Sequence, residues 1–426
     1  MKYNFDSYML YQTGKMIRNV IRVKVTMKYP IDLKILRTAV NTATERYPYF
    51  KKRVTVNEEG AYILEDNPLP IVVIPTQKKA PAIGCAAVNH HLLYVDAEDN
   101  TIYFCISHTL AGGKGVQPWL MTCLWQYVTD KFHVNLSVPG LRKPDSPLLP
   151  TELSCPTYER LTKEKPIYEP ACPKAVMLLG DYLNGFVNPF AKREEYYLFT
   201  FNQADFMKYC HATDSSVASL FSVLLFKAFD RILPKKASVI RAMMAHNPCN
   251  SLGIPDAHCD IRNHIHVDYN RELAGYSMEK LGTITRGQMI LQMDPSCAAV
   301  GVRKILDMIE GIDSVQGLKQ KRKYAKRANQ SLGKGALHGT YYVNYTGYTD
   351  WGDLANYVES SAAIVDGHMV TEVSAVGDKI FLAPMALVNE EKYIKALSDV
   401  LDELKIPYKL EGPFPKNLPY QEFPRA

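Results

Sequence analysis

The chain has 426 residues, of which 47% are hydrophobic, and its 50 basic and 44 acidic side chains give a net charge of +6. This length and apolar content suffice for two or three domains with sizeable cores. The small net charge gives no global signature of nucleic-acid binding, and no signal peptide or apolar run of about 18 residues, the length of a membrane span, is present. We therefore expect a globular cytoplasmic protein without a membrane span.

The nine cysteines are scattered along the chain and never form a CxxC pair. This spacing argues against a disulfide framework and against a zinc knuckle. We expect the thiols to be reduced, with several of them in the core.

The first half of the chain is predicted to mix strands with two amphipathic helices. Residues 19–29 alternate like a half-buried strand, and Asp32 then caps a helix that Pro48 ends. A second helix follows a glycine-rich turn, with Pro118 in its first turn. Between the two helices lie short strand-like runs at residues 61–65, 71–75, 91–95 and 101–107.

The second half repeats this coarse order after a proline-rich crossover at residues 138–190. A strand at residues 196–201 precedes a buried helix, which Asp214 caps and which runs to Ile232. The remaining predicted strands are at residues 237–245, 261–268, 338–346, 360–365 and 370–384. The remaining predicted helices are at residues 277–293, 298–311, 315–329 and 389–404.

The turn at residues 105–115 holds the main candidate for a catalytic side chain. His108 ends an apolar strand and precedes several glycines, so its imidazole can project into a cleft while the sheet holds its backbone. A neutral imidazole in such a place is a suitable general base. Because an arbitrary histidine there more often has only a structural role, the interpretation depends on the surrounding pattern.

That pattern resembles the coenzyme A-dependent acyltransferases related to chloramphenicol acetyltransferase, the alcohol acetyltransferases and the condensation domains of peptide synthetases. The resemblance rests on the helix end at residues 45–54, the buried helix at 215–232 and the turn at 107–115, which matches the family motif HHxxxDG. It implies an α/β fold of two chloramphenicol-acetyltransferase-like subdomains, a pseudo-dimer with an interface tunnel. We place these subdomains at residues 1–170 and 171–426.

The turn departs from the motif at two positions. Ser107 stands where the first histidine falls, and Gly112, followed by Gly113, stands where the aspartate falls. The resemblance implies that His108 takes the proton of an attacking hydroxyl or amine, and that the aspartate shapes the loop through an arginine of the other half. Leu252 stands in the best match to that arginine's segment, so both charges are missing together and neither is left uncompensated.

Acyl transfer also needs a donor for the oxyanion of the tetrahedral intermediate. Residues 341–347 resemble the family's late strand, in which an Asn or Ser faces the tunnel, so Asn344 is the candidate; an ordinary turn residue at a strand end is the equal alternative. The resemblance implies no metal and no bound organic cofactor. Acyl-CoA is then the donor substrate, with carrier-protein phosphopantetheine as the alternative donor.

Two further clusters have competing interpretations. His264 and His266 share a strand face at a spacing that can bind zinc, but no third ligand is defined, and a polar loop entering a strand is favoured. Lys321 and Arg322 belong to a basic helix that suits the phosphates of coenzyme A or an acidic carrier protein. A solvated helix face is the favoured interpretation of that stretch.

The expected function is transfer of an acyl group from coenzyme A to the hydroxyl or amine of a small acceptor, with His108 as general base. The missing aspartate and arginine favour the alternative, a catalytically degenerate condensation-like protein for binding or carrier docking. The acceptor, the acyl length and the oligomeric state are open at this point.

Overall fold

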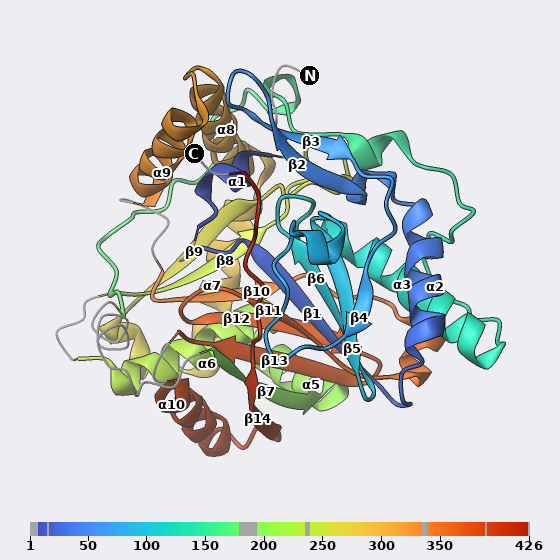
Figure 1. The fold of residues 1–426 in the computed structure, drawn as a ribbon. Helices are drawn as coiled ribbons and strands as arrows, with labels where there is room; N and C mark the ends of the chain where they lie inside the picture. Colours follow the sequence, from blue (N-terminus) through green and yellow to red (C-terminus); the bar gives the residue numbers. More distant parts are fainter. Residues whose placement is uncertain are drawn as a thin grey trace.

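The computed structural model describes residues 7–14, 17–178, 194–234, 239–333, 339–387 and 390–424. Within these residues two large twisted sheets lie next to each other at the centre of the molecule, with helices on their outer faces (Figure 1). The first sheet has the order β11-β1-β6-β5-β4. Its strands are β11 (Val358–Val365), β1 (Val20–Met27), β6 (Thr101–Ser107), β5 (Leu93–Glu98) and β4 (Val73–Pro75).

The second sheet has the order β14-β7-β13-β12-β10-β8-β9. Its strands are β14 (Lys409–Pro415), β7 (Glu195–Asn202), β13 (Lys379–Met385), β12 (Val370–Val376), β10 (Tyr341–Tyr345), β8 (Val239–His246) and β9 (Asn263–Asn270). A separate hairpin joins β2 (Lys52–Val56) to β3 (Tyr62–Asp66).

Strand β11 belongs to the second half of the sequence but to the first sheet. It pairs antiparallel with β1, from Ile21 opposite Val365 to Met27 opposite Val358, while the other edge of β1 pairs with β6. A strand from the C-terminal half therefore completes the sheet of the N-terminal half. The predicted boundary at residue 170 lies in the crossover before β7, and the two subdomain ranges stay a prediction.

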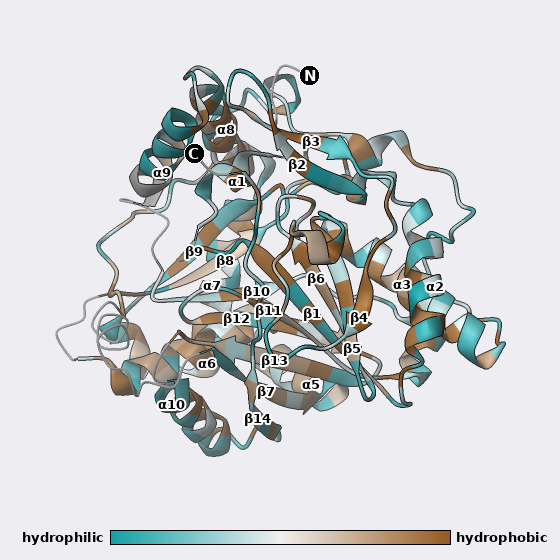
Figure 2. Cartoon of the chain, in the orientation of Figure 1, coloured by the Kyte–Doolittle hydropathy of each residue, from teal (hydrophilic) through white to brown (hydrophobic). Residues whose placement is uncertain are grey.

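The helices cover the sheets from outside. Helices α2 (Leu33–Glu45) and α3 (Gly113–Phe132) pack against each other beside the first sheet. Helices α6 (Val217–Ile232), α7 (Met278–Met293) and α10 (Glu390–Glu403) pack beside the second. The others are α1 (Tyr8–Gln12), α5 (Gln203–Ala212), α8 (Pro295–Asp313) and α9 (Leu318–Gly333). In Figure 2, α9 is largely hydrophilic and the strands of the first sheet are largely hydrophobic.

Alternation along β7 shows how the cores are arranged. Tyr196 and Leu198 face the core shared with the first sheet, whereas Tyr197 and Phe199 face the core formed with α6 and α10. Successive side chains of a strand point to opposite faces, so the second sheet is buried on both sides. A third core joins α1, α8 and α9 to the segment around Cys249–Ile261.

Most predicted elements are present, with local corrections. Asp32 caps α2 as expected, through the backbone amides of Lys34 and Ile35. Asp214 does not cap α6: Ser216 does, and Asp214 pairs with Arg286 instead.

Other corrections concern where a helix begins and which elements the sequence patterns did not predict. Pro118 lies in the interior of α3 and not in its first turn, because α3 begins at Gly113. Strands β2 and β14 and helix α5 were not predicted, and residues 370–384 form two strands, β12 and β13. The predicted crossover is described up to residue 178, and residues 179–190 lie outside the described residues.

In the part of the chain that the structure describes, no single helix has the length and hydropathy of a membrane span. Helices α5 and α6 meet that criterion only when taken together, and they are bent by 77°.

Candidate functional site

A cavity of about 470 Å³ lies between the two sheets. Strands β1 and β11 of the first sheet and β10 and β12 of the second contribute to its walls, together with the start of α3 and the segment before β9. The residues used below that line it are His108, Gly112, Gly113, Asp260, Arg262, His264, Asn344 and Glu372. The structure thus brings four of the predicted site residues, His108, Gly112, Gly113 and Asn344, to one cavity.

A second cavity of about 470 Å³ adjoins the first. Arg262 and His264 line both cavities, so these two side chains stand between them. The crossover residues Tyr168 and Cys172 and residues of α8 form the outer walls of the second cavity. The interface between the halves is therefore hollow on both sides of Arg262 and His264.

His108 is held at the end of β6 by backbone pairing. Its amide donates to the carbonyl of Asn19 at 2.9 Å, which continues the β1–β6 ladder by one residue. Ser107 is buried and donates its hydroxyl to Gln421 Oε1 at 2.9 Å, so this motif residue fixes the turn to the C-terminal segment and does not line the cavity. The sheet thus sets the backbone of His108 and leaves its side chain at the cavity.

Two glycines of the turn, Gly112 and Gly115, are packed against residues 256–262, which we call the strap. A Cβ on Gly115 would lie 2.0 Å from the carbonyl oxygen of His258, and a Cβ on Gly112 would lie 2.7 Å from Oδ1 of Asp260. The strap comes from the second half of the chain and crosses directly over the start of α3. Gly115 therefore permits a backbone approach that any side chain would block.

A carboxylate from the strap faces His108. Asp260 Oδ2 lies 4.0 Å from His108 Nδ1 and 3.3 Å from Arg262 Nη2. Both Asp260 Oδ2 and His108 Nδ1 are buried without a hydrogen-bond partner among the described residues. The site therefore holds a carboxylate, a guanidinium and an imidazole close together, and Asp260 Oδ2 lies near both of the other groups.

Burial governs the protonation of the histidines at the cavity. Burial lowers the pKa of His108 to about 4, and the nearby Asp260 carboxylate opposes this effect while Arg262 adds to it. Burial and Arg262 likewise lower the pKa of His264 to about 4. Both imidazoles are therefore neutral at physiological pH, which is the state that a proton acceptor needs.

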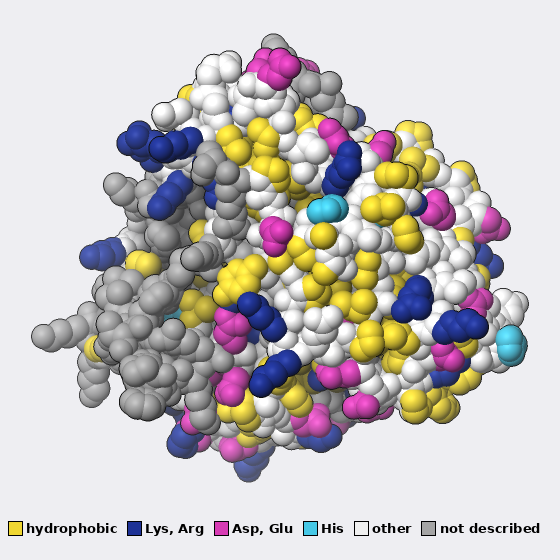
Figure 3. Space-filling model, viewed as in Figure 1, with side chains coloured by type: hydrophobic (Ala, Val, Ile, Leu, Met, Phe, Trp, Pro, Cys, Tyr) yellow, Lys and Arg dark blue, Asp and Glu magenta, His cyan; other side chains and the backbone are white. Residues whose placement is uncertain are grey.

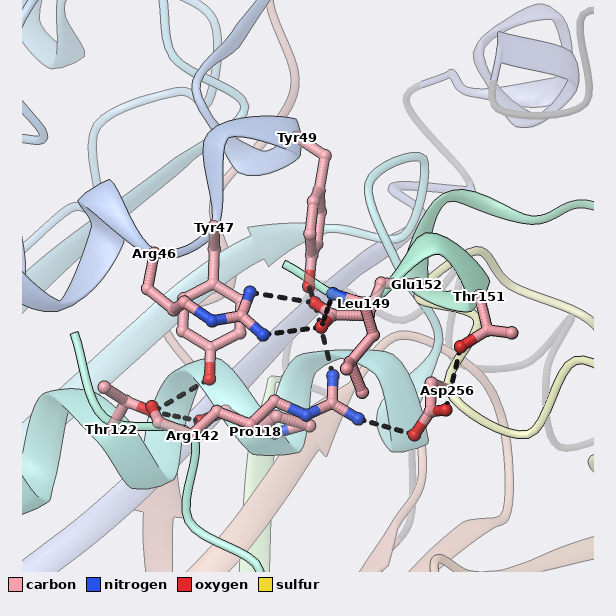
Figure 4. Close-up of polar contacts among 10 residues, drawn as sticks. All are labelled: Arg46, Tyr47, Tyr49, Pro118, Thr122, Arg142, Leu149, Thr151, Glu152 and Asp256. Carbon is pink, nitrogen blue, oxygen red and sulfur yellow. Dashed lines mark hydrogen bonds and ion pairs between the residues drawn. The ribbon is translucent and has the colours of Figure 1, made fainter. Parts of the chain in front are cut away.

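A buried network anchors the strap to the first half of the chain (Figure 4). Glu152 receives Arg46 Nη2 at 2.6 Å, Tyr49 Oη at 2.7 Å and Arg142 Nη1 at 3.3 Å, and Arg142 also binds Asp256 Oδ1 at 2.8 Å. Burial alone would raise the pKa of Glu152, but its hydrogen bonds from Arg46, the backbone and Tyr49 lower it below the usual value. Glu152 is thus ionised and fully paired beneath the strap.

Asn344 and Glu372 form the opposite wall. They are paired residues on the neighbouring strands β10 and β12, and Asn344 Nδ2 donates to Glu372 Oε1 at 2.7 Å. Burial raises the pKa of Glu372 to about 7, although the bond from Asn344 opposes this shift. The amide of Asn344 is therefore fixed in orientation at the cavity wall, and the carboxyl group beside it titrates near neutral pH.

Lys321 and Arg322 lie elsewhere, and the structure does not bring them to the cavity. Lys321 is buried and donates to the carbonyls of Ile312 and Asp313 at the end of α8. Arg322 donates to the carbonyls of Leu10 and Thr13 and to the hydroxyl of Tyr62. Their charges hold α9 against its neighbours.

The remaining cations of α9, such as Lys323, are exposed. Figure 3 shows basic side chains gathered over this helix. Among the described residues, no group of three or more His, Cys, Asp or Glu side chains has the geometry to hold a metal ion.

Sequence reasoning missed Asp260, Arg262 and Glu372 as parts of the site. Asp260 stood in a polar run that was interpreted as a loop, and its position opposite Gly112 depends on a contact between distant segments. One signal in the sequence could have indicated this contact. Gly112 stands in the motif's aspartate position, and Asp260 and Arg262, two residues apart, had no assigned role.

Comparison with known proteins identifies the fold. Neither family models nor curated protein sequences match the chain. Among solved structures, a trichothecene 15-O-acetyltransferase from Fusarium sporotrichioides superposes with a TM-score of 0.60 and 11% identity over 94% of each chain. F. graminearum TRI101, crystallised with coenzyme A and T-2 mycotoxin, superposes with a TM-score of 0.56 and 9% sequence identity. The match covers 95% of this chain and 98% of TRI101.

Two other kinds of protein share this architecture. Polyketide synthase associated protein 5 from Mycobacterium tuberculosis superposes with a TM-score of 0.58 and 12% identity over 93% of this chain and 96% of its own. The first condensation domain of the CDA synthetase superposes with a TM-score of 0.54 and 11% sequence identity, over 93% of this chain and 95% of its own. The chain has the two-lobed fold of the coenzyme A-dependent acyltransferases and condensation domains, which confirms the predicted fold class.

Proposed function

We propose that this protein transfers an acyl group from coenzyme A to the hydroxyl or amine of a small acceptor, with His108 as the general base. The observation that carries the proposal is a neutral, cavity-facing imidazole at the junction of two sheets in this fold. Structures with coenzyme A bound to proteins of the same fold support acyl-CoA as the donor. A cytoplasmic location remains part of the proposal.

The base acts through the nitrogen that does not face the strap. With Nδ1 of His108 turned toward Asp260, Nε2 is the nitrogen that takes the proton of the acceptor as its oxygen or nitrogen attacks the thioester carbonyl. The tetrahedral intermediate then collapses, the carbon–sulfur bond breaks, and the departing thiolate receives the proton from His108. Acceptor, donor and proton balance without a metal or a redox partner.

Asn344 is the proposed donor to the oxyanion. One N–H of its side-chain amide binds Glu372, which leaves the second N–H for a developing negative charge in the cavity. A fixed donor of this kind typically contributes about 10²–10³ in kcat. Asn344→Ala is therefore expected to lower kcat by that factor, with a smaller change in KM.

The test is release of free thiol from acetyl-CoA with a panel of small alcohols and amines. The proposal expects turnover by the wild-type protein and a loss of about 10²–10⁴-fold in His108→Ala, which removes the base. His211→Ala, which changes an exposed histidine of α5, is the matched control and should retain wild-type turnover. Undiminished turnover in His108→Ala would contradict the role given to this residue.

Gly112 favours a second candidate, a catalytically degenerate protein that binds a carrier or ligand, because the motif aspartate is missing. Calorimetric titration with coenzyme A separates the two. Binding without thiol release for any acceptor supports the second candidate. If turnover occurs only when the acyl group is bound to a phosphopantetheinylated carrier protein, the donor is the carrier protein and not coenzyme A.

A further inference from the structure

The strap carries a carboxylate into the space that the motif aspartate would occupy. We propose that Asp260 is a positioning residue for His108: it accepts the Nδ1–H of the imidazole and, with Arg262, supplies from the second half of the chain the charge pair that Gly112 and Leu252 lack. The role in turnover rests on the proposed function. The effect on the imidazole does not, because it follows from the geometry alone.

Gly112 is explained by Asp260 and not by its own backbone. Its φ of −81° and ψ of 176° are accessible to any residue. The three atoms nearest to a Cβ placed there all belong to Asp260: Oδ1 at 2.7 Å, Cα at 3.4 Å and Cγ at 3.5 Å. A side chain at position 112 and the carboxylate of Asp260 therefore compete for the same volume.

The two atoms that the proposal joins lack a hydrogen bond among the described residues, although Asp260 Oδ2 is ion-paired with Arg262. Buried polar groups in folded proteins nearly always find a hydrogen bond, yet Nδ1 of His108 and Oδ2 of Asp260 have none among the described residues and stand 4.0 Å apart. A hydrogen bond of about 2.8 Å needs an approach of roughly 1 Å. Catalytic hydrogen bonds are commonly long before substrate binds, so closure on binding is the expected behaviour.

Arg262 forms an ion pair with the carboxylate of Asp260. Its guanidinium lies 3.3 Å from Asp260 Oδ2, and burial, which disfavours the charged guanidinium, is outweighed by Asp260, so that the pKa of Arg262 is raised. The arginine lies two residues after its carboxylate in the same strap. The pair is built into one segment, whereas the family motif divides it between two.

The strap is held firmly enough to aim Asp260. Residues of the strap contact the first half: Asp256 binds Arg142 at 2.8 Å, Nδ1 of His258 lies 2.8 Å from the carbonyl of Leu110, and Cys259 Sγ donates to the carbonyl of Ser154 at 3.4 Å. These contacts hold the strap immediately before Asp260. The backbone of Asp260 therefore stays against the His108 turn, where its Cα would lie 3.4 Å from a Cβ on Gly112.

Imidazole nitrogen NMR tests the orientation without any assay of activity. In protein labelled with [15N]histidine, the signals of His108 are those that vanish in His108→Ala. We expect the Nδ1–H tautomer in the wild type and a shift of the population toward Nε2–H in Asp260→Ala. Asp260→Asn, whose amide oxygen still accepts, should lie between the two.

Asp256→Asn is the matched control. It removes the same charge from the same strap, but its side-chain oxygen still accepts from Arg142, so the strap stays in place. The control should leave the His108 tautomer unchanged and alter turnover by less than about twofold. Asp260→Ala should lower kcat by about 10–100-fold, the usual loss when the group that orients a reacting side chain is removed.

A double variant that combines Gly112→Asp with Asp260→Gly tests directly whether the two side chains compete for one volume. Gly112→Asp alone overlaps Asp260 and should destabilise the turn, whereas the double variant frees that volume and puts a carboxylate back at position 112. We expect at least a tenfold recovery of kcat in the double variant relative to Gly112→Asp. No recovery would contradict the competition for one volume.

The outcomes separate this inference from the proposed function. A wild-type tautomer in Asp260→Ala, in a protein shown by circular dichroism to be folded, overturns the positioning role. Turnover that survives His108→Ala overturns the role of His108 as general base and leaves the tautomer measurement to decide the inference. A change of tautomer in a protein without turnover supports Asp260 and contradicts only the enzymatic role.

Discussion

Tyr49 and His258 stack on each other, with ring centroids 4.2 Å apart and ring planes 18° from parallel. The first residue follows α2 and the second belongs to the strap, so the stack joins the two halves next to His108. Tyr49 also donates its hydroxyl to the buried carboxylate of Glu152. One side chain therefore connects the stack to the network below it.

Tyr49→Phe is expected to lower the free energy of unfolding by about 1.5–3 kcal/mol, the usual worth of a hydrogen bond to a charged group. The ring and the stack on His258 are retained, so the loss reports the bond to Glu152. Urea unfolding followed by circular dichroism measures it. Tyr348→Phe, at a side chain that is 63% exposed, is the control and should change the free energy by less than about 0.5 kcal/mol.

The pKa of His108 sets an expectation for the pH profile of turnover. Because burial lowers this pKa to about 4, the imidazole is already neutral at pH 6, and protonation of His108 should lower kcat/KM only as the pH approaches 4. Initial rates at acceptor concentrations well below KM, measured from pH 4 to pH 8, test it. An acidic limb centred near 6.5, the ordinary histidine value, would contradict the buried environment.

Glu372→Gln should change stability in a pH-dependent way. Burial raises the pKa of Glu372 to about 7, so the native state holds its proton where the unfolded state, with an ordinary pKa near 4.5, has lost it. Wild-type stability contributed by this group is therefore present below pH 4.5 and lost as the pH rises through 7.

The glutamine variant carries no such penalty and still accepts the bond from Asn344. Its free energy of unfolding should exceed that of the wild type at pH 8 and match it at pH 4. Urea titrations at the two pH values give the comparison. An equal difference at both values would show that Glu372 is not the source.

Lys321→Met should affect stability and not coenzyme A binding. The ammonium group is buried against the last carbonyls of α8, and its loss should cost about 1.5–3 kcal/mol. The KM for acyl-CoA should stay within about twofold of the wild type. Lys323→Met, at an exposed position of the same helix, is the control for the charge change, and a rise in KM for Lys321→Met alone would return this residue to the donor site.

The sequence predicted those parts of the fold that depend on local patterns. The strand β1, the Asp32 cap of α2 and the buried helix α6 are all encoded within a few residues, and the structure contains each of them. The predicted half-buried alternation of β1 is wrong at Val20, Ile21 and Arg22, which are all buried. The short edge strands β2 and β14 were missed because they are half exposed and lack a clear alternation. The cap at Ser216 was missed because Asp214 two residues earlier is an equally good capping type.

Only the residues of the candidate site that belong to recognisable local motifs could be predicted from the sequence. His108 and Asn344 follow from their own segments, whereas Asp260 reaches Gly112 through a contact between residues about 150 positions apart in the chain. Lys321 and Arg322 were assigned from charge alone, and charge does not reveal whether a side chain is turned toward solvent or toward a helix end. Long-range contacts of this kind are set by the tertiary packing of the strap.

Strand β11 has a consequence for how the protein unfolds and for how it can be dissected. Because a strand of the C-terminal half closes one edge of β1, a fragment that ends at residue 170 would expose the unpaired amides and carbonyls of Ile21 through Met27. Open edges of this kind recruit strands from other molecules. Separating the halves would therefore open a sheet edge at the cavity itself, because residues of both β1 and β11 line it.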